Sequence, residues 1–539
     1  MSGIKRAFSS VSWENSFVRE LPGETRGMNV PRQVTGACYS RVMPSPVSAP
    51  ELLAVVPEVL ELLGLEVPSA ELEQFTEVMA GNQLLPAMEP YATCYGGHQF
   101  GHWAGQLGDG RVLALGELRN LEGQRFEVQL KGAGPTPYSR GADGRAVLRS
   151  SLREFVCSEA MYHLGIPTTR ALSLTATGEQ VTRDMLYNGN PRREPGAVVC
   201  RVAPSFLRFG SYQLPAARRE VALLRSLADY TLREYFPDLG PPGREAYGAW
   251  FLEVCKRTAT LMVHFMRVGF VHGVLNTDNM SILGLTMDYG PYGWVEGFDP
   301  LFTPNTTDAS GRRYCFGRQP AVAAWNLARL GEALLPLLGS PATVERALQQ
   351  YVDSFEEGLR TTQLRKLGLE TYVPDEDDAL IEEVGEVMGL TEIDMTLFYR
   401  CLVDLEPSSG AGRQTESEDA LIAPLRKAFY SDAIDAPSPI RTRICAFLRR
   451  YLLRTRREGL SPVARRARMN RENPKYVFRN YLAQQAIEQL QQGDNTLLRD
   501  LMTVLRQPYE EHPSFEHLAV RRPDWARERP GCSMLSCSS

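Results

Sequence analysis

The pattern of hydrophobic and polar positions divides the chain into a mixed first part and a helical second part. Apolar residues recur at helical spacing within residues 50–80, which predicts a helix there. Residues 94–175 combine glycine-rich turns with short strands, and Arg125–Lys131 alternates strictly between polar and apolar positions. Residues 145–163 predict a further helix, and Ala197–Ala203 predict a further strand.

Beyond Pro215 the apolar spacing is mostly helical. Helices are predicted at residues 216–235, 246–269, 320–338 and 341–360, and several more between 380 and 510. An α+β half followed by a mostly α half favours two lobes, joined near residues 209–216.

Composition excludes several classes of protein. The chain has 539 residues, of which 43% are hydrophobic and 23% are charged, so a disordered, collagen-like or coiled-coil protein is excluded. The formal net charge of -5 gives no support for a chain-wide nucleic-acid-binding surface. We expect no membrane span, because no stretch of about 18 apolar residues occurs. Without an apolar signal core, a cytoplasmic location is expected, with the mitochondrial matrix as the alternative.

Two blocks of charge stand out in the second half. Residues 375–394 hold nine acidic residues and no basic one, whereas residues 441–480 hold thirteen basic residues against two glutamates. The basic block is either a patch for an anionic partner or a set of solvated helix faces that dock on the acidic block. The second interpretation is favoured, because aromatic residues are sparse among the basic ones.

The ten cysteines do not form the pattern of a disulfide scaffold. Five of them lie singly in apolar segments and are predicted to be reduced core thiols: Cys157, Cys200, Cys255, Cys401 and Cys445. Cys532 and Cys537 differ, because they lie in a short polar segment at the end of the chain.

A glycine-rich segment is the first candidate for binding chemistry. Residues 96–110 contain six glycines and are followed by Arg111. Glycines such as Gly108 and Gly110 allow backbone N–H groups to approach a phosphate closely, and an arginine adds positive charge. Structural hairpins share this composition. A metal site at Cys94, His98 and His102 is disfavoured, because the intervening glycines oppose a helix that would align the three side chains.

Lys131 and Glu154 form a second candidate pair. Lys131 ends the alternating strand on its polar face, and Glu154 lies 23 residues later within the next predicted helix. In kinase-like folds, a helix glutamate holds a strand lysine that points at nucleotide phosphates. The alternative is that both side chains are exposed and never meet.

The segment from Phe270 to Pro291 is the most informative one. Asn279 and Asp288 offer the amide and carboxylate oxygens that Mg²⁺ prefers. Asp278 beside them is suited to accept a proton from a hydroxyl nucleophile. Turn chemistry alone explains one or two of these residues but not the cluster.

Arg201 and Arg208 flank an apolar transition from strand to loop. Because an unpaired buried charge is costly, the two guanidinium groups either form structural ion pairs or bind anionic oxygens. The sequence leaves both interpretations open.

These elements follow the order found in protein kinases, with one departure. When His272 and Asn279 are aligned with the kinase motif H-R-D-x-x-x-x-N, Val274 stands where the catalytic aspartate belongs. Valine cannot accept a proton. Ordinary phosphoryl transfer is therefore compromised unless Asp278 substitutes from a different position.

Four motifs together closely resemble the selenoprotein O family. They are Gln129–Pro137, Arg149–Phe155, His272–Ser281 and the terminal Cys537–Ser539, and the resemblance extends from about residue 30 to the end. It implies a kinase-fold pseudokinase that binds ATP in an inverted orientation and transfers AMP to Ser, Thr or Tyr hydroxyls of proteins. A uridylyltransferase that uses UTP and Mn²⁺ is a close variant. The sequence also leaves open a true protein kinase that uses Asp278 and a non-catalytic nucleotide-binding scaffold.

The resemblance also implies residue roles. Asp278 is expected to be the proton acceptor, Asn279 and Asp288 to hold Mg²⁺ or Mn²⁺, and Glu154 to pair with Lys131 structurally. The nucleotide contacts that it implies are Gly108, Gly110, Arg111, Lys131, Asp143, Gly144, Arg201, Arg208 and Asp288.

The implied organisation is an α+β, protein-kinase-like two-lobe fold with N- and C-terminal helical extensions. It comprises an N-terminal extension (1–93), an N-lobe (94–213), a helical C-lobe with the catalytic loop (214–520) and a tail (521–539). Some family members have a redox-sensitive disulfide from the tail to the activation segment. For this chain the hypothesis is a regulatory disulfide between Cys537 and either Cys315 or Cys532.

Overall fold

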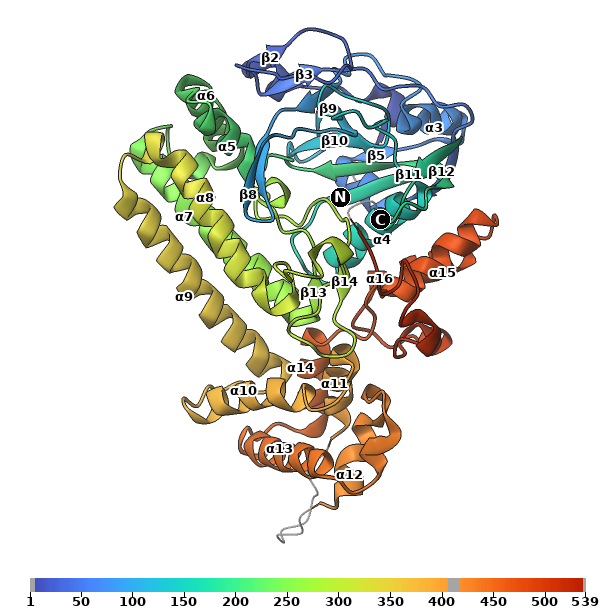
Figure 1. Ribbon diagram of the computed structural model, residues 1–539, viewed down its shortest axis with the longest axis vertical. Coiled ribbons are helices and arrows are strands. Elements are labelled where there is room, and N and C mark those ends of the chain that lie inside the picture. Colours follow the sequence, from blue (N-terminus) through green and yellow to red (C-terminus); the bar gives the residue numbers. More distant parts are fainter. Residues whose placement is uncertain (1–4, 406–415, 537–539) are drawn as a thin grey trace.

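The computed structural model describes residues 5–405 and 416–536, and it shows a mixed α/β architecture in which a large sheet is followed by helices (Figure 1). The main sheet has eight strands. In spatial order they are β2 (Gly23–Glu24), β3 (Tyr39–Arg41), β6 (Tyr91–Thr93), β9 (Val112–Arg119), β10 (Arg125–Lys131), β12 (Arg192–Ala203), β11 (Arg170–Arg183) and β4 (Glu51–Val55).

The centre of this sheet carries the predicted alternating strand. Strand β10 lies between β9 and β12 and pairs antiparallel with both, with Lys131 opposite Val199 on β12. The strand predicted at 197–203 is confirmed, although it begins earlier, at Arg192. The polar face of β10 is not solvent-exposed, because Glu127, Gln129 and Lys131 are all buried. This row of polar side chains is therefore buried inside the protein.

The helix predicted over residues 50–80 is wrong for its first part. Residues Glu51–Val55 form the edge strand β4, which pairs with β11, and helices follow at α2 (Pro57–Leu63) and α3 (Leu72–Ala80). Pro57 occupies the first turn of α2. Because proline lacks an N–H and clashes with a preceding helical turn, the helix begins there rather than continuing through it.

Three two-stranded pairings lie outside the main sheet. They are β1 (Arg6–Ala7) with β5 (Leu65–Glu66), β7 (Gly96–Gln99) with β8 (His102–Gln106), and β13 (Phe270–Val271) with β14 (Gly293–Trp294). Helix α1 (Ser16–Glu20) is short, and α4 (Leu148–His163) packs against β11 and β12. The helix predicted at residues 145–163 is thus confirmed.

The second half is helical. Its elements are α5 (Phe209–Ala217), α6 (Val221–Tyr235), α7 (Arg244–Val268), α8 (Gln319–Leu338), α9 (Pro341–Lys366), α10 (Glu376–Met388), α11 (Met395–Cys401), α12 (Glu418–Ile422), α13 (Pro439–Arg457), α14 (Pro462–Glu472), α15 (Asn480–Gln491) and α16 (Thr496–Arg506). The helix predicted at 216–235 is confirmed as α6, but it begins at Val221, because the chain turns at Arg219, whose φ is +60°, and residues 216–217 end α5 instead.

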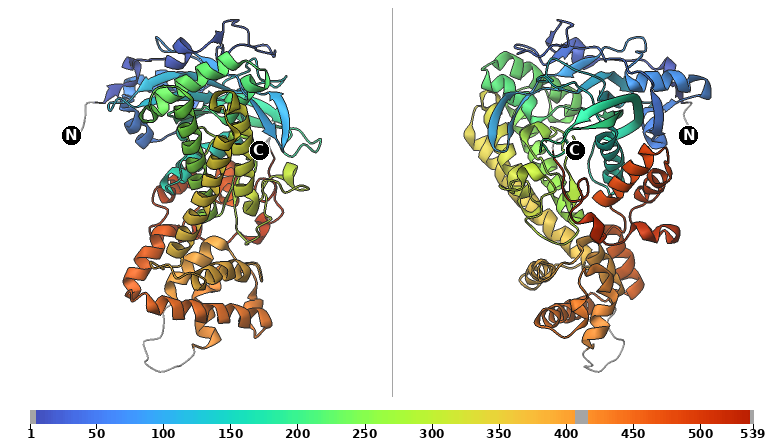
Figure 2. Two further views of the ribbon diagram at one scale, coloured as in Figure 1. Left: turned by 90° about the vertical axis from the view of Figure 1, so that its left-hand side faces the viewer. Right: turned by 45° about the vertical axis from the view of Figure 1, so that its right-hand side comes forward.

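The last two helices return to the sheet side of the molecule. Helices α15 and α16 both contact α4, and Figure 2 shows these late elements beside it. Arg153 of α4 secures the contact, because its guanidinium donates to Asn480 Oδ1 at 3.2 Å and to the carbonyl of Tyr292 at 2.9 Å. The order of elements along the chain therefore differs from their order in space.

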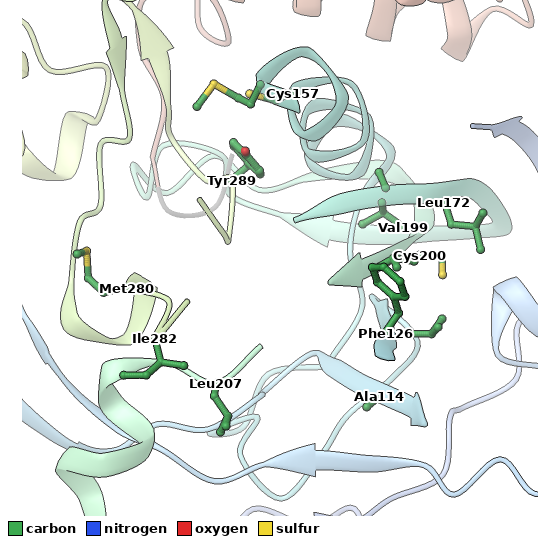
Figure 3. Close-up of a cluster of buried hydrophobic side chains, with 14 of the residues drawn as sticks. Ala114, Phe126, Cys157, Leu172, Val199, Cys200, Leu207, Met280, Ile282 and Tyr289 are labelled. Atoms are coloured by element: carbon green, nitrogen blue, oxygen red, sulfur yellow. The ribbon is translucent and has the colours of Figure 1, made fainter. Parts of the chain in front are cut away.

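A continuous core joins the sheet to the loop that follows α7. Figure 3 shows Phe126 and Cys200 on the sheet, Cys157 on α4, and Met280 and Ile282 on that loop; all five belong to one cluster of buried hydrophobic residues. All five side chains are buried. Because protein interiors are closely packed, this cluster fixes the loop relative to the sheet.

The acidic and basic blocks pair with each other, as favoured from the sequence. Helix α10 carries most of the acidic block and contacts α13 of the basic block. Arg454 lies 2.8 Å from Asp377, and both side chains are buried. At the surface, Arg443 and Arg450 both pair with Glu383.

One helical segment in the described part of the chain, Phe316–Leu338, is long and apolar enough to cross a membrane by length and composition alone. Its mean hydropathy is 1.2, and 56% of the segment's most apolar window is buried. Helix α8 within it packs against α5, α7 and α9. Because a buried core helix passes the same test, this is weak evidence for a membrane span.

Candidate active site

A cleft of about 610 Å³ lies between the main sheet and the loops that follow α7. Its volume is within the range of small-molecule sites. It brings together nine residues singled out from the sequence, namely Gly108, Gly110, Arg111, Lys131, Asp143, Gly144, Asp278, Asn279 and Asp288. Arg201 and Arg208 do not line the cleft, but both contact Asp288 from behind it.

Lys131 and Glu154 meet in the structure. Strand β10 carries Lys131, and α4 carries Glu154; the Nζ and Oε2 atoms are 2.5 Å apart. Burial lowers the pKa of Lys131, and the Glu154 carboxylate opposes that shift. The lysine therefore stays at the cleft wall with a buried counter-charge, and the alternative that both side chains are exposed is excluded.

Three cationic side chains surround the Asp288 carboxylate. Its Oδ1 lies 2.5 Å from Arg201 Nη1, its Oδ2 lies 2.6 Å from Arg208 Nη1, and Lys131 Nζ is 3.7 Å away. Burial opposes ionisation, but the three cations outweigh it and hold the pKa of Asp288 well below its usual range. Asp288 also has φ of +57°, a backbone conformation uncommon for non-glycine residues. The three cations thus hold a strained, ionised carboxylate in place.

The two arginines are fully buried and are fixed by further contacts. Arg201 also donates to Gln129 Oε1 at 2.5 Å and pairs with Glu154 at 3.1 Å. Arg208 stacks over the Tyr95 ring at 4.3 Å and donates to the backbone carbonyl of Asp278 at 2.7 Å. Of the two interpretations left open by the sequence, structural ion pairing is therefore observed. The same guanidinium groups still lie directly behind the cleft.

Arg111 differs from these cations. Its side chain lines the cleft, and within the described residues its guanidinium forms no hydrogen bond or ion pair. Glu154 and Asp288 attract it without direct contact and oppose the lowering of its pKa by burial. An arginine at a cleft wall whose donors make no direct bond is suited to bind an anionic ligand.

Asp278 lies on the opposite wall. It is 7% exposed, and burial raises its pKa to about 6, although a hydrogen bond from Gln99 opposes the shift. Gln99 Nε2 donates to Asp278 Oδ2 at 3.0 Å. A buried carboxyl whose pKa approaches neutrality is suited to general-base chemistry.

Asn279 is oriented for cation binding. Its Nδ2 donates to the carbonyl of Val274 at 2.7 Å, so the amide oxygen is the atom left for a ligand. Together with Asp288 it offers one amide and one carboxylate oxygen. Mg²⁺ is commonly held by one or two carboxylates together with substrate phosphates, so this donor set fits such a cation. Residues 5–405 and 416–536 contain no cluster of three or more His, Cys, Asp or Glu that could hold a metal alone.

Glycines shape the sheet side of the cleft. A Cβ on Gly108, whose φ is +74°, would lie 2.3 Å from the Tyr138 ring, and a Cβ on Gly144 would lie 2.2 Å from the backbone of Gly134. Larger residues therefore cannot replace either glycine without displacing the cleft wall. The glycines of β7 and β8, by contrast, belong to a hairpin. This hairpin contacts the loop that carries Asp278, and no sequence pattern indicated that contact.

The β11–β12 connection adds cleft residues that no motif marks. Arg183 ends β11 and Tyr187 lies in the connection, and both line the cleft. Arg183 pairs with Asp143 at 2.6 Å, so the Asp143 carboxylate already has a cationic partner beside the cleft. Arg183 and Tyr187 lie far along the chain from the glycine-rich segment. Their part in the cleft follows only from the pairing of β11 with β12.

The disfavoured metal site at Cys94, His98 and His102 does not form. Cys94 is buried, and His102 is exposed on β8. The His98 ring contacts the rings of Trp103 and Trp325, with centroid separations of 5.0 and 5.4 Å.

The core-thiol prediction holds for the cysteines that the structure describes. Nine of them are free and buried, including Cys315 and Cys532. Cys537 lies outside the described residues, so its pairing stays a prediction. The preceding Leu535 lies beside the segment around Asn305, because Thr306 N–H donates to the Leu535 carbonyl at 2.7 Å.

Comparison with known proteins agrees with this geometry. Residues 30–506 match the family model described as "Protein adenylyltransferase SelO". The chain is 56% identical over 544 residues to the "Protein nucleotidyltransferase YdiU" of Nitrosospira multiformis, covering 98% of this chain and 96% of that protein. It is 55% identical to the proteins of that name from Xanthomonas campestris pv. campestris (strain B100) and Azoarcus sp. (strain BH72), with 98% of this chain and 99% of each covered. The chain therefore belongs to the SelO family and is a protein nucleotidyltransferase, as its motifs predicted.

Proposed function

We propose that this enzyme transfers AMP from ATP to Ser, Thr or Tyr hydroxyl groups of protein substrates, with Mg²⁺ or Mn²⁺. The observation that carries the proposal is the position of the carboxylates. Val274, which aligns in sequence with the catalytic aspartate of kinases, lines the cleft, and so does Asp278, four residues later. Because the base is displaced from the kinase position, the acceptor hydroxyl that it deprotonates is suited to attack the α-phosphorus of ATP rather than the γ-phosphorus that kinases transfer.

The architecture in this proposal is a protein-kinase-like two-lobe fold. The N-lobe (94–213) supplies α4 and four strands of the main sheet, β9 to β12, and the extension 1–93 adds the other four, β2, β3, β4 and β6. The later helices form the C-lobe (214–520), followed by the tail 521–539. The contact of Lys131 with Glu154, and the order of Lys131, Glu154, Asn279 and Asp288 along the chain, support this assignment.

The charge distribution supports an inverted ATP orientation. Lys131 at the cleft wall, and Arg201 and Arg208 behind it, all contact Asp288. There they would neutralise the β- and γ-phosphates, which become the departing pyrophosphate, while the α-phosphorus faces outward. A cation held by Asn279 and Asp288 would supply further neutralisation of phosphate charge.

In the proposed reaction, the acceptor hydroxyl oxygen bonds to the α-phosphorus of ATP. The bond from that phosphorus to the oxygen bridging the α- and β-phosphates breaks, and pyrophosphate leaves with its electron pair. Asp278 takes the hydroxyl proton. Charge is balanced, because the negative charge that the Asp278 carboxylate loses on protonation appears on the departing pyrophosphate.

Labelled nucleotides test the proposal. The purified protein is incubated with a protein acceptor, Mg²⁺ or Mn²⁺, and ATP labelled at either the α- or the γ-phosphate; UTP labelled at the α-phosphate runs in parallel. Label from α-ATP, and not from γ-ATP, supports AMP transfer. Preferential labelling from α-labelled UTP with Mn²⁺ would indicate that UMP, not AMP, is transferred. Label from γ-labelled ATP would indicate a protein kinase, and no label from any nucleotide would indicate a non-catalytic scaffold.

A further inference from the structure

The hairpin of β7 and β8 contacts the loop that carries Asp278. Because side chains alternate along a strand, Gly97 and Gln99 lie on one face of β7, and His98 lies on the other. His98 contacts Trp103 and Trp325, so its face is directed away from the loop. Gly97 and Gln99 are both directed at Asp278.

Three consecutive loop residues accept hydrogen bonds from this hairpin. His98 N–H donates to Thr277 Oγ1 at 2.7 Å, and Phe100 N–H donates to Asn276 Oδ1 at 3.2 Å. Gln99 provides the third bond, from its side-chain amide to Asp278 Oδ2 at 3.0 Å. The two backbone bonds fix the loop in register with the hairpin, and the Gln99 bond reaches the carboxylate itself.

The Asp278 carboxylate has few other constraints. Its Oδ1 is buried and has no hydrogen-bond partner in the part of the chain that the structure describes. This oxygen faces Gly97, because a Cβ at that glycine would lie only 2.5 Å from Oδ1, so the backbone of Gly97 closes its side. Gln99 lines the cleft, whereas Gly97 does not. Oδ2, which accepts from Gln99 and keeps a second lone pair, is therefore the oxygen on the cleft side.

We propose that Gln99 is a positioning residue that orients the Asp278 carboxylate toward the acceptor hydroxyl. The inference rests on the proposed function in one respect, namely that Asp278 accepts the hydroxyl proton. The terminal torsion of aspartate is broad and weakly restrained by itself. The hydrogen bond from Gln99 therefore fixes the direction in which the free lone pair of Oδ2 points, and general-base catalysis depends on that geometry.

Two substitutions at Gln99 distinguish the effect of its hydrogen bond to Asp278 from the effect of its side-chain shape. Gln99→Met keeps the length of the side chain but removes the donor, and Gln99→Glu keeps the shape but places a carboxylate against Asp278. We expect kcat to fall about 10- to 100-fold in Gln99→Met and further in Gln99→Glu, with KM for ATP and the melting temperature unchanged. His102→Ala, an exposed change on the same hairpin, is the control and should retain wild-type kcat.

A double-variant cycle provides the decisive test. If Gln99 acts through Asp278, then Gln99→Met should change the residual rate of Asp278→Asn by less than about twofold. Full additivity of the two losses, or wild-type kcat in Gln99→Glu, would overturn the positioning role. If Asp278→Asn itself retains the wild-type rate, then the assignment of the proton acceptor is wrong, and the inference about Gln99 is wrong with it. Loss in Asp278→Asn with no loss in Gln99→Met would overturn the inference alone.

Discussion

Lys131 Nζ lies 2.5 Å from Glu154 Oε2, and the same glutamate pairs with Arg201 at 3.1 Å. One buried carboxylate therefore holds two cations that also contact Asp288. Because desolvated charges require nearby counter-charges, removal of one member should disturb the other members.

Replacement of Lys131 should impair transfer more than replacement of Glu154. Lys131→Ala removes a charge at the cleft wall, and we expect kcat/KM to fall on the order of 10²–10³-fold. Glu154→Gln keeps the cation but loosens it, so a fall of roughly tenfold is expected. Steady-state kinetics with labelled ATP measures both. Lys256→Ala, at an exposed position of α7, should have no effect; equal activity of Lys131→Ala and the wild type would contradict the role of Lys131.

Asp288→Ala should abolish transfer. The substitution removes a proposed cation ligand and leaves Arg201 and Arg208 without their shared anion, so a lower melting temperature is also expected. Asp288→Asn preserves the size of the side chain and should raise the Mg²⁺ or Mn²⁺ concentration needed for half-maximal activity. Metal titrations of the variants and the wild type test this. Full activity in Asp288→Ala would show that the metal assignment is wrong.

Glu127 should make stability depend on pH. Burial raises its pKa to about 7, with Glu117 and Asp109 adding to the shift, while Gln129 and the Phe206 N–H donate to it and oppose the shift. The folded protein therefore binds a proton that the unfolded chain releases above pH of about 4.5. The stabilisation from this proton is present below that pH, decreases as pH rises to about 7, and is absent above it.

The measurement compares Glu127→Gln with the wild type. A shift from 4.5 to about 7 corresponds to about 3 kcal/mol. The variant should therefore gain up to that amount in relative stability between pH 4.5 and 8, as followed by urea unfolding at several pH values. Glu122→Gln, at an exposed turn, serves as the control. A pH-independent difference would contradict the prediction.

Asp377→Asn should destabilise the contact between α10 and α13 without affecting the active site. The change leaves the buried Arg454 guanidinium with only Glu458 as its carboxylate partner among the described residues. A buried charge that loses its partner typically costs about 3–5 kcal/mol, and the remaining pair should reduce that cost. Chemical unfolding measures the loss. Asp375→Asn, an exposed change on the same segment, should cost little, and lower kcat in the folded Asp377 variant would argue against an independent structural role.

Local sequence was sufficient for the elements with strong periodicity. Strand β10 and helix α4 lie where their patterns predicted them, and so Lys131 and Glu154 were identified correctly as a pair. The pattern failed at residues 51–55, because an edge strand with apolar neighbours resembles a helix face over so short a span. It also placed the start of α6 too early, because Arg219, a single residue in a left-handed conformation, separates α5 from α6.

The sequence by itself determined the residue types that carry the chemistry and their order along the chain: Lys131, Glu154, Asp278, Asn279 and Asp288. Only the tertiary structure decided which side chains surround each carboxylate. Arg201, Arg208 and Lys131 meet at Asp288, and Gln99 meets Asp278 across 179 residues of chain. Periodicity and motifs report neighbours along the chain, whereas the charge and orientation of a buried carboxylate depend on neighbours in space. Those neighbours are set by strand pairing and core packing.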